Sequence, residues 1–335
     1  MKSAYLIKPG RIELVEKSIP APGEGEVLIR VKSALTCGTD LKAYLRGHPL
    51  ISMPGPFGHE FSGVIAEVGS GVNGFKKDEP VMLVHTAPCG ECEYCKRGLF
   101  NLCSVLTKDM TLGAFSEYII VNKRVVKQNM FHKPDSVSFE QAAFLEPLSC
   151  VVHGVRVLNP QGKDNVLIIG TGPIGLLFIQ VLKLKGVNVA VLGRNSFKLN
   201  LAKELGADEI FTYSEDLLNF TDGFGFDSVI ECTGKKEVWL KSVSYIRKGG
   251  TVLLFGGLKS GTEVCYNAGR LHYDEITLKG VFHYTPDDIK EAADLIKSGN
   301  LKFTKLISGN FSLSGITVAF EKLSKGEGIK YLIEP

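Results

Sequence analysis

Apolar and polar positions follow two different patterns in the two halves of this chain. The first half contains short runs that are rich in β-branched residues and bounded by glycine or proline, a pattern typical of strands. From residue 165 onward, strand-like apolar runs alternate with stretches of helical period. The clearest predicted strands are 26–34, 61–70, 113–121, 165–170, 187–193, 227–234 and 249–257, and the helices between them include 173–186 and 196–207. Apolar strands that alternate with helices predict a parallel sheet with both faces covered.

The change of pattern near residue 150 predicts two domains, and 335 residues is also long for a single core. After a last long helix at 286–299, the chain ends in a mixed segment that is too short to fold alone. We expect this tail to return to the first domain. The prediction is therefore a discontinuous β-rich domain of residues 1–150 and 283–335, with an α/β domain of residues 151–282 between its parts.

Composition and charge exclude several classes of protein. The net charge of +3 is too small to indicate a nucleic-acid or anionic-membrane partner. No window approaches eighteen continuous apolar residues, so we expect no membrane-spanning segment. The first residues alternate like a strand and lack the apolar core of a signal peptide. The eight cysteines include four scattered ones, which fits a reduced, cytoplasmic protein better than a disulfide framework.

Four cysteines form the most specific local pattern in the chain. They follow the spacing Cys-x2-Cys-x2-Cys-x7-Cys and are Cys89, Cys92, Cys95 and Cys103. Four thiolates this close in sequence favour a tetrahedral zinc site, and four protein ligands leave no open position, so the zinc would be structural. The alternatives are a pair of disulfides or a zinc-ribbon nucleic-acid module. A zinc-ribbon nucleic-acid module would require a basic loop, but the charges of Glu91 and Glu93 cancel those of Lys96 and Arg97 here.

A glycine-rich loop follows the predicted strand at 165–170 and opens the next helix. It reads Gly170-Thr171-Gly172-Pro173-Ile174-Gly175. In this context the first glycine permits a tight turn, the second lets the backbone approach a pyrophosphate, and the third lets helix and strand pack closely. The helix N-terminus adds amides and a favourable dipole for phosphates. The loop predicts a dinucleotide site, and the alternative is a glycine-rich turn without a ligand.

The end of the next predicted strand decides which dinucleotide is favoured. A carboxylate there would accept a hydrogen bond from a free ribose 2′-hydroxyl and repel a 2′-phosphate. This chain has Gly193 at that point, followed by Arg194, Asn195 and Lys198. A guanidinium pairs well with a phosphate group. We therefore predict NADP(H) over NAD(H), with an Arg194 that stacks on adenine or faces solvent as the alternative.

A second set of metal-type residues lies in the β-rich half. Cys37 precedes Gly-Thr-Asp, and His59 and Glu60 follow Gly58. A thiolate and an imidazole with a carboxylate or water suit a catalytic zinc, which keeps one position for substrate. A single Cys or His in a core is usually packing, but these occur beside a four-cysteine cluster and a dinucleotide loop. The combination indicates a zinc enzyme.

Several motifs occur in the order found in one enzyme family. They are CGTD at 37–40, GHEFSGVIAEVG at 58–69, the cysteine cluster, GAFSEY at 113–118, FLEPLSC at 144–150, GTGPIG at 170–175 and KGVFHY at 279–284. Over nearly its whole length the chain resembles the zinc-dependent medium-chain alcohol dehydrogenases, especially the sorbitol and threonine dehydrogenase-like branch. The resemblance implies a GroES-like catalytic domain and a doubly wound Rossmann domain.

By this resemblance, Cys37 and His59 are zinc ligands. Glu60 is either a ligand or a carboxylate that exchanges with water beside the metal. Glu146 matches a carboxylate that lies near the metal and ligates it directly or through water, with a helix-start acidic residue as the alternative. Asp40 is expected to orient a ligand, and Cys150 is expected near the nicotinamide as a small buried residue.

The resemblance also assigns Thr39 as the hydroxyl that hydrogen-bonds the substrate oxygen. Two positions depart from the family pattern: Lys42 stands where many members have a relay histidine, and His283 stands where sorbitol-type members have an arginine. The first departure leaves the proton route open, and His48 is not assigned to it. Further cofactor contacts by analogy are Thr233 and Gly256, each at the end of a predicted strand.

The resulting prediction is a zinc-dependent oxidoreductase that transfers a hydride between NADP(H) and a secondary alcohol or polyol. One alternative is an NAD-dependent threonine-type dehydrogenase acting on an amino alcohol. Another is a catalytically silent relative that binds nucleotide, which the intact set of candidate residues argues against. We expect one catalytic and one structural zinc per chain, no nucleic-acid or membrane partner, and a homodimer or homotetramer.

Overall fold

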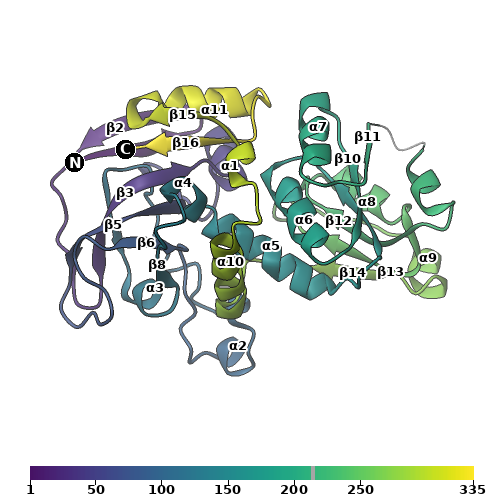
Figure 1. The fold of residues 1–335 in the computed structure, drawn as a ribbon, viewed down its shortest axis with the longest axis horizontal. Coiled ribbons are helices and arrows are strands. Elements are labelled where there is room, and N and C mark those ends of the chain that lie inside the picture. Colours follow the sequence, from purple (N-terminus) through teal and green to yellow (C-terminus); the bar gives the residue numbers. More distant parts are fainter. Residues whose placement is uncertain (213–215) are drawn as a thin grey trace. The chain divides into compact units, whose positions relative to one another are not determined.

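The structure is a computed structural model that describes residues 1–212 and 216–335. The chain divides into two compact units (Figure 1). Unit 1 consists of Met1–Ser149 and Tyr284–Pro335, and unit 2 consists of Cys150–His283. The helix α5 (Leu145–Leu158) begins in unit 1 and continues into unit 2.

Unit 1 is built from two sheets. Its strands are β1 (Lys2–Lys8), β2 (Arg11–Glu16), β3 (Val27–Leu35), β4 (Gly55–Pro56), β5 (Glu60–Val68), β6 (Pro80–Leu83), β7 (Tyr118–Val121), β8 (Met130–His132), β15 (Ile307–Ser312) and β16 (Lys330–Glu334). The larger sheet has the order β15-β16-β3-β5-β6-β8, with β7 also paired to β3, and the smaller has the order β2-β1-β4. The C-terminal strand β16 pairs antiparallel with β3, so the last residues of the chain are part of the same sheet as residues 27–35.

Short helices join and cover these strands. They are α1 (Gly38–Arg46), α2 (Glu93–Lys96), α3 (Lys123–Gln128), α4 (Phe139–Ala142), α10 (Pro286–Ser298) and α11 (Ile316–Ser324), with 3-10 turns η1 (Phe100–Leu102), η3 (Phe303–Leu306) and η4 (Leu313–Gly315). The start of α10 shows why the chain turns helical there: Thr285 and Asp288 form a reciprocal capping box, and Pro286 occupies the first turn.

The core of unit 1 contains an aromatic cluster. The Phe57 and Phe115 rings lie 4.9 Å apart edge to face, and Phe320 of α11 lies 5.5 Å from Phe57. All three side chains are fully buried. Because aromatic rings bury a large apolar area and favour such edge contacts, this cluster fixes α11 against the loop that leads to His59.

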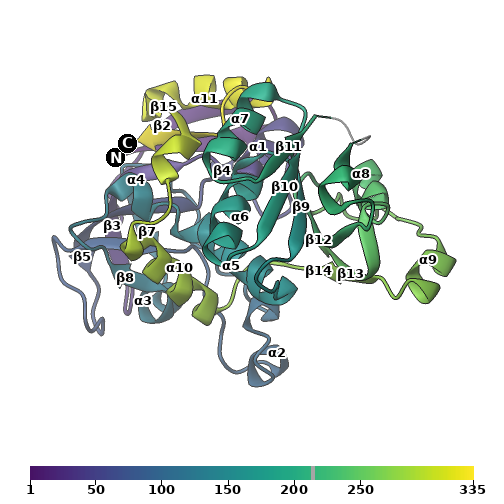
Figure 2. The same ribbon diagram turned by 45° about the vertical axis from the view of Figure 1, so that its right-hand side comes forward.

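Unit 2 contains a six-stranded parallel sheet with the order β11-β10-β9-β12-β13-β14 (Figure 2). Its strands are β9 (Asn165–Ile169), β10 (Asn188–Leu192), β11 (Glu209–Phe211), β12 (Phe226–Glu231), β13 (Ile246–Leu254) and β14 (Thr277–Gly280). Its further helical segments are α6 (Pro173–Leu184), α7 (Ser196–Glu204), η2 (Leu217–Thr221), α8 (Lys236–Ser242) and α9 (Ala268–Tyr273). Helices α6 and α7 contact β9, β10 and β11, whereas α8 contacts β12 and β13.

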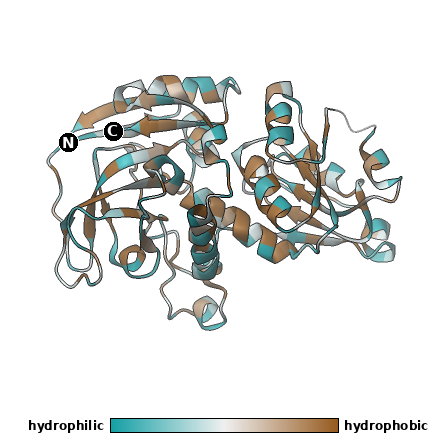
Figure 3. Ribbon diagram, viewed as in Figure 1, coloured by the Kyte–Doolittle hydropathy of each residue, from teal (hydrophilic) through white to brown (hydrophobic). Residues whose placement is uncertain are grey.

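The central strands of unit 2 contain apolar segments, which are brown in Figure 3. Residues 166–169 of β9 are buried, as expected for a strand whose two faces are both covered. The prediction of a β-rich domain combined with a parallel Rossmann-type sheet is confirmed.

Candidate functional site

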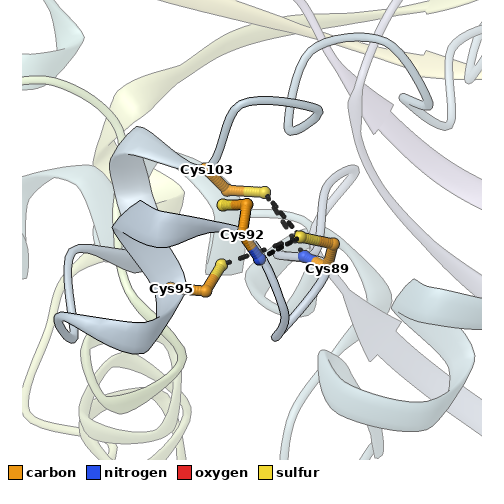
Figure 4. Close-up of side chains that lie close together, drawn as sticks. All are labelled: Cys89, Cys92, Cys95 and Cys103. Carbon is orange, nitrogen blue, oxygen red and sulfur yellow. Dashed lines mark hydrogen bonds between the residues drawn. The ribbon is translucent and has the colours of Figure 1, made fainter.

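The four cysteines of the loop 89–103 lie around a common centre in unit 1 (Figure 4). The Cys89 and Cys95 sulfurs are 3.9 Å apart, and those of Cys89 and Cys103 are 3.5 Å apart. A regular tetrahedron with Zn–S bonds of about 2.3 Å has sulfur–sulfur edges of about 3.8 Å, whereas a disulfide needs about 2.05 Å. The spacing therefore fits a four-thiolate metal site and not a disulfide.

Backbone amides stabilise the charged form of these thiols. The Cys92 amide donates to Cys89 Sγ at 3.4 Å, and the Cys89 amide donates to Cys103 Sγ at 3.3 Å. Backbone donors from Cys95 and Ser104 lower the pKa of Cys92 to about 5. Metals bind thiolates and not thiols, so the lowered pKa of Cys92 favours a cation. Burial raises the pKa of Cys95 to about 12, so a metal bound there would displace the proton of that thiol.

A second cluster forms where β3 meets α1. Cys37 is the N-cap of α1, and its sulfur accepts a hydrogen bond from the Thr39 amide at 3.4 Å. His59 Nδ1 lies 3.3 Å from Oδ1 of the fully buried Asp40. With Nδ1 held by a carboxylate, the other ring nitrogen of His59 is free to bind a metal, an arrangement found in many zinc sites. Ligand atoms of Cys37, Asp40 and His59 lie within 4.8 Å of one another.

Glu60 joins this cluster from the first position of β5. One of its oxygens accepts a hydrogen bond from the Nζ of Lys330, and Lys330 is the first residue of β16. Lys330 also donates to the Thr36 carbonyl at 2.9 Å. Both charged side chains are 1% exposed, so the ion pair lies in the protein interior. The C-terminal strand thereby supplies a permanent positive charge next to a candidate ligand.

Glu146 reaches the same place from the first turn of α5. Ligand atoms of His59, Glu60 and Glu146 lie within 4.8 Å of one another. His85 Nδ1 is 3.5 Å from Glu146 Oε1 and 3.2 Å from the Tyr284 hydroxyl. The Thr86 hydroxyl donates to that of Tyr284 at 3.1 Å. These neighbours restrict the position of the Glu146 carboxylate.

The charge balance of this cluster fits a bound cation. Four acidic groups are gathered in the interior, and Lys330 is the permanently positive group among them. Burial raises the pKa of Cys37 and Glu60, and it raises that of Glu146 to about 7. Burial alone would lower the pKa of His59, but the charges of Asp40 and Cys37 raise it well above its usual range. Burial thus disfavours the ionised forms of Cys37, Glu60 and Glu146, and a divalent metal bound among them would favour those forms. The donor set of thiol, imidazole and carboxylates suits zinc.

The glycine loop of unit 2 has the shape that a pyrophosphate needs. Gly170 has a φ of +116°, and a Cβ there would lie 3.0 Å from Thr233 Cγ2. A Cβ at Gly175 would lie 2.0 Å from the Gly170 carbonyl, so only glycine allows this helix–strand contact. A Cβ at Gly172 would meet nothing within 4 Å. This open approach to the N-terminus of α6, where Pro173 and Ile174 form the first turn, is suited to an anion.

Gly193, the first residue after β10, is packed closely against the Thr171 side chain. A Cβ at Gly193 would lie 2.8 Å from Thr171 Cγ2, closer than real contacts allow. The next residue, Arg194, is exposed, and Asn195 caps α7 by accepting from the Lys198 amide at 3.0 Å. Neither Arg194 nor Lys198 forms an ion pair with any residue that the structure describes. Two positive groups without a counter-charge among residues 1–212 and 216–335 thus flank this turn.

A buried glutamate shapes the end of the neighbouring strand β12. Glu231 Oε1 accepts hydrogen bonds from the Thr233 amide at 2.6 Å, the Gly234 amide at 3.1 Å and the Thr233 hydroxyl. A Cβ at Gly256 would lie 2.6 Å from Glu231 Oε2, so Gly256 packs directly on this carboxylate. Glu231 therefore fixes the backbone at both Thr233 and Gly256.

Comparison with known proteins decides the family. The family model of the alcohol dehydrogenase GroES-like domain matches residues 23–133, and that of the zinc-binding dehydrogenases matches residues 173–298. The sorbitol dehydrogenase of Halalkalibacterium halodurans is 33% identical over 336 residues, which cover 97% of this chain and 96% of that protein. The chain belongs to the zinc-binding alcohol dehydrogenase family.

Two further members of the family bear on cofactor and substrate. The D-arabitol-phosphate dehydrogenase of Enterococcus avium is 32% identical over 100% of this chain and 97% of its own. A structure from Sinorhizobium meliloti 1021, assigned as a zinc-binding dehydrogenase and bound to NADP, superposes with a TM-score of 0.89 at 29% identity, covering 100% of this chain and 99% of that one. The predicted class of enzyme, a zinc- and nicotinamide-dependent alcohol or polyol dehydrogenase, is confirmed.

The structure of this dehydrogenase brings together Cys37, His59, Glu60 and Glu146, as their proposed shared role requires. Sequence reasoning assigned no role to His85, Tyr284, Lys330 or Glu231. The position of His85, four residues before the cysteine loop, was the available signal for it, and a lysine inside the apolar run 329–333 was the signal for Lys330. Within the described residues, no helix is long and apolar enough to cross a membrane. The expected homodimer or homotetramer stays a prediction.

Proposed function

We propose that this dehydrogenase interconverts a secondary alcohol or polyol and its ketone with NADP(H) as the hydride carrier. The buried cluster of Cys37, His59, Glu60 and Glu146 is the observation that carries the proposal. The names of the sorbitol and D-arabitol-phosphate dehydrogenases support a polyol-type substrate. Unit 1 would hold the alcohol, and unit 2 would hold the dinucleotide.

Two zinc ions per chain belong to the proposal. Cys37 and His59 would hold the catalytic zinc, with Glu60 and Glu146 as direct or water-bridged carboxylates. Zinc held at this position would supply a Lewis acid that lowers the pKa of the alcohol. Cys89, Cys92, Cys95 and Cys103 would hold the second, structural zinc, and their sulfur spacing supports this assignment.

The reaction removes a hydride and a proton from the carbinol group. A bound nicotinamide would accept the hydrogen with the electron pair of the C–H bond, and loss of the hydroxyl proton would leave the carbonyl. We assign the Thr39 hydroxyl to receive the hydroxyl proton and pass it toward solvent. Thr39 is half-buried at the start of α1, two residues from Cys37, which is consistent with this role.

The preference for NADP(H) rests on the turn after β10. A Cβ at position 193 would lie 2.8 Å from Thr171 Cγ2, so an aspartate that selects a free ribose would require the Thr171 side chain to shift. Arg194 and Lys198 offer positive charge to a 2′-phosphate, since neither pairs with a carboxylate among the described residues. The NADP bound by the Sinorhizobium meliloti relative supports the same choice.

An alcohol panel tests the proposal. Zinc-loaded protein would be assayed at 340 nm with NADP+ and separately with NAD+, using free polyols, phosphorylated polyols, L-threonine and simple secondary alcohols. We expect oxidation of a polyol-type substrate with a higher kcat/KM for NADP+, and loss of activity after zinc removal. Oxidation of L-threonine with NAD+ alone would favour the amino-alcohol alternative and contradict the proposal.

A further inference from the structure

The helix α1, whose N-cap is the candidate zinc ligand Cys37, has two basic residues on the same side as Thr39. Thr39, Lys42 and Arg46 are spaced by three and four residues, so they lie on one side of α1. The buried residues Asp40, Ala43 and Tyr44 define its core-facing side. The helix rises about 1.5 Å per residue, which puts Lys42 and Arg46 about 4.5 and 10 Å beyond Thr39 along its axis.

A histidine in the turn after α1 adds to this basic side. The Gly47 amide donates to the Ala43 carbonyl at 2.9 Å, and the Ile51 amide donates to the His48 carbonyl at 3.1 Å. Ile51 is 3% exposed and anchors the turn in the core. The ring of His48 accepts a hydrogen bond at Nδ1 from the Leu50 amide at 3.3 Å. This bond places the ring proton on Nε2, so His48 offers a donor to an incoming ligand.

These basic groups lack a counter-charge. Within the described part of the chain, no carboxylate lies within ion-pair distance of Lys42, Arg46 or His48, and the nearby Asp40 faces His59 instead. Lys42 is nevertheless half-buried. Burial and then the charge of Lys42 lower the pKa of His48, with Asp40 opposing and His59 and Arg46 adding to the effect. The groups are therefore close enough to repel one another, because charge effects fade within about 10 Å.

We propose that Lys42, Arg46 and His48 form a phosphate subsite, so that the substrate is a phosphorylated polyol. The inference rests on the proposed function and narrows its substrate class. A phosphate dianion would neutralise the repulsion and accept charge-assisted hydrogen bonds from all three groups. Its place one to two helical turns from Thr39 suits a phosphate several bonds away from the reacting carbinol. The phosphate ester is bound without any bond to phosphorus being made or broken.

The structure also suggests how each residue contributes. Lys42 lies nearest to Thr39 in the helix and is half-buried, so it would supply the largest share of selectivity. Arg46 lies in the last helical turn, where a positive charge also stabilises the helix dipole, so Arg46→Met would change stability as well as binding. Lys42→Met is therefore the cleaner variant. Lys290→Met is its matched control, because Lys290 is an exposed lysine on α10 without an ion pair among the described residues.

The first experiment titrates inorganic phosphate into zinc-loaded protein by calorimetry. Saturating NADP+ would be present, so that the anion site at the glycine loop is filled. We expect the wild type and Lys290→Met to bind phosphate with equal affinity and Lys42→Met to bind it about 10- to 100-fold more weakly, the usual range for a charge-assisted hydrogen bond. Absence of binding to the wild type, or equal binding to Lys42→Met, would overturn the subsite.

The second experiment compares kcat/KM for galactitol 1-phosphate and for galactitol. We expect the wild type to favour the phosphorylated compound, and Lys42→Met to lower this ratio about 10- to 100-fold while Lys290→Met leaves it unchanged. Equal kcat/KM values for the two compounds would overturn the inference and leave the proposed function intact. If Lys42→Met raises the Kd for NADP+ but leaves the ratio of the two kcat/KM values unchanged, Lys42 binds the cofactor. That result would also overturn the phosphate subsite. If no alcohol is oxidised, the proposed function fails, and the phosphate titration still decides the subsite separately.

Discussion

The buried ion pair between Lys330 and Glu60 permits a sharp prediction about how strand β16 supports the candidate zinc cluster. Both side chains are 1% exposed, and Lys330 Nζ also donates to the Thr36 carbonyl at 2.9 Å. Lys330→Met removes the positive charge but roughly keeps the volume. Glu60 would then be a buried carboxylate without its partner, and the Thr36 carbonyl would lose a hydrogen bond.

The expected loss follows from this geometry. Removing one member of a buried pair typically costs about 3–5 kcal/mol, because the remaining charge is left uncompensated. Solvent screening does not reduce this figure here, since neither group is exposed. Glu60→Gln in the Lys330→Met background removes the stranded charge. We therefore expect the double variant to regain part of the loss, with a coupling energy of about 2–3 kcal/mol.

Urea unfolding of the zinc-loaded proteins, followed by circular dichroism, gives the free energies of unfolding for the wild type, both single variants and the double variant. Zinc content is measured on each sample, so that metal loss is separated from loss of the pair. Lys290→Met is the control and should lie within about 0.5 kcal/mol of the wild type, because it is an exposed surface change. A loss below about 1 kcal/mol for Lys330→Met, or a coupling energy near zero, would refute this reasoning.

Three further predictions concern the other parts of the site. Arg194→Asp should raise the Kd for NADPH about 10- to 100-fold and leave the Kd for NADH unchanged or lower. Nicotinamide fluorescence measures both Kd values. The control Lys185→Asp, at the far end of α6, should change neither of them. Cys92→Ser should lose one of the two proposed zinc ions per chain, as measured by mass spectrometry, and unfold at lower urea concentration. The control Cys265→Ser changes an exposed cysteine outside the cluster and should keep both zinc ions. Two zinc ions retained by Cys92→Ser would contradict the structural site. Glu231→Gln should keep an oxygen at the Oε1 position but replace Oε2 with an amide donor, which would oppose the Gly234 amide 3.3 Å away. We expect this change to lower the free energy of unfolding by about 1–3 kcal/mol and to weaken NADPH binding. Equal NADPH affinity in Glu231→Gln and in the exposed control Glu237→Gln would show that Glu231 does not position the cofactor loop.

Local patterns explain why much of the fold and candidate site could be predicted. The four cysteines lie within a single short loop, so their spacing alone restricts them to one small volume. The glycine loop is equally local, because a strand, a turn and a helix follow one another without interruption. In both cases, the chemistry depends on neighbours in sequence, which a reader of the sequence can see.

The parts that escaped prediction depend on pairing between distant segments. Lys330 is 270 residues from Glu60, and its position follows from the register of β16 beside β3. Tyr284 and His85 are 199 residues apart and meet only because the chain returns to unit 1 at Tyr284. The role of Glu231 depends on the backbone geometry of two strand ends, β12 and β13. Hydrophobic patterns do not encode such long-range registers residue by residue.

The central claim is that an NADP(H)-dependent dehydrogenase is built on these two units, and one titration tests it without knowledge of the substrate. The purified, zinc-loaded protein would be titrated with NADPH and with NADH, following nicotinamide fluorescence at fixed ionic strength. The account predicts binding of both nucleotides, with a Kd for NADPH about 10- to 100-fold lower, because only NADPH has a 2′-phosphate with which Arg194 and Lys198 would pair. Tighter binding of NADH would contradict the cofactor assignment, and binding of neither nucleotide would contradict the account as a whole.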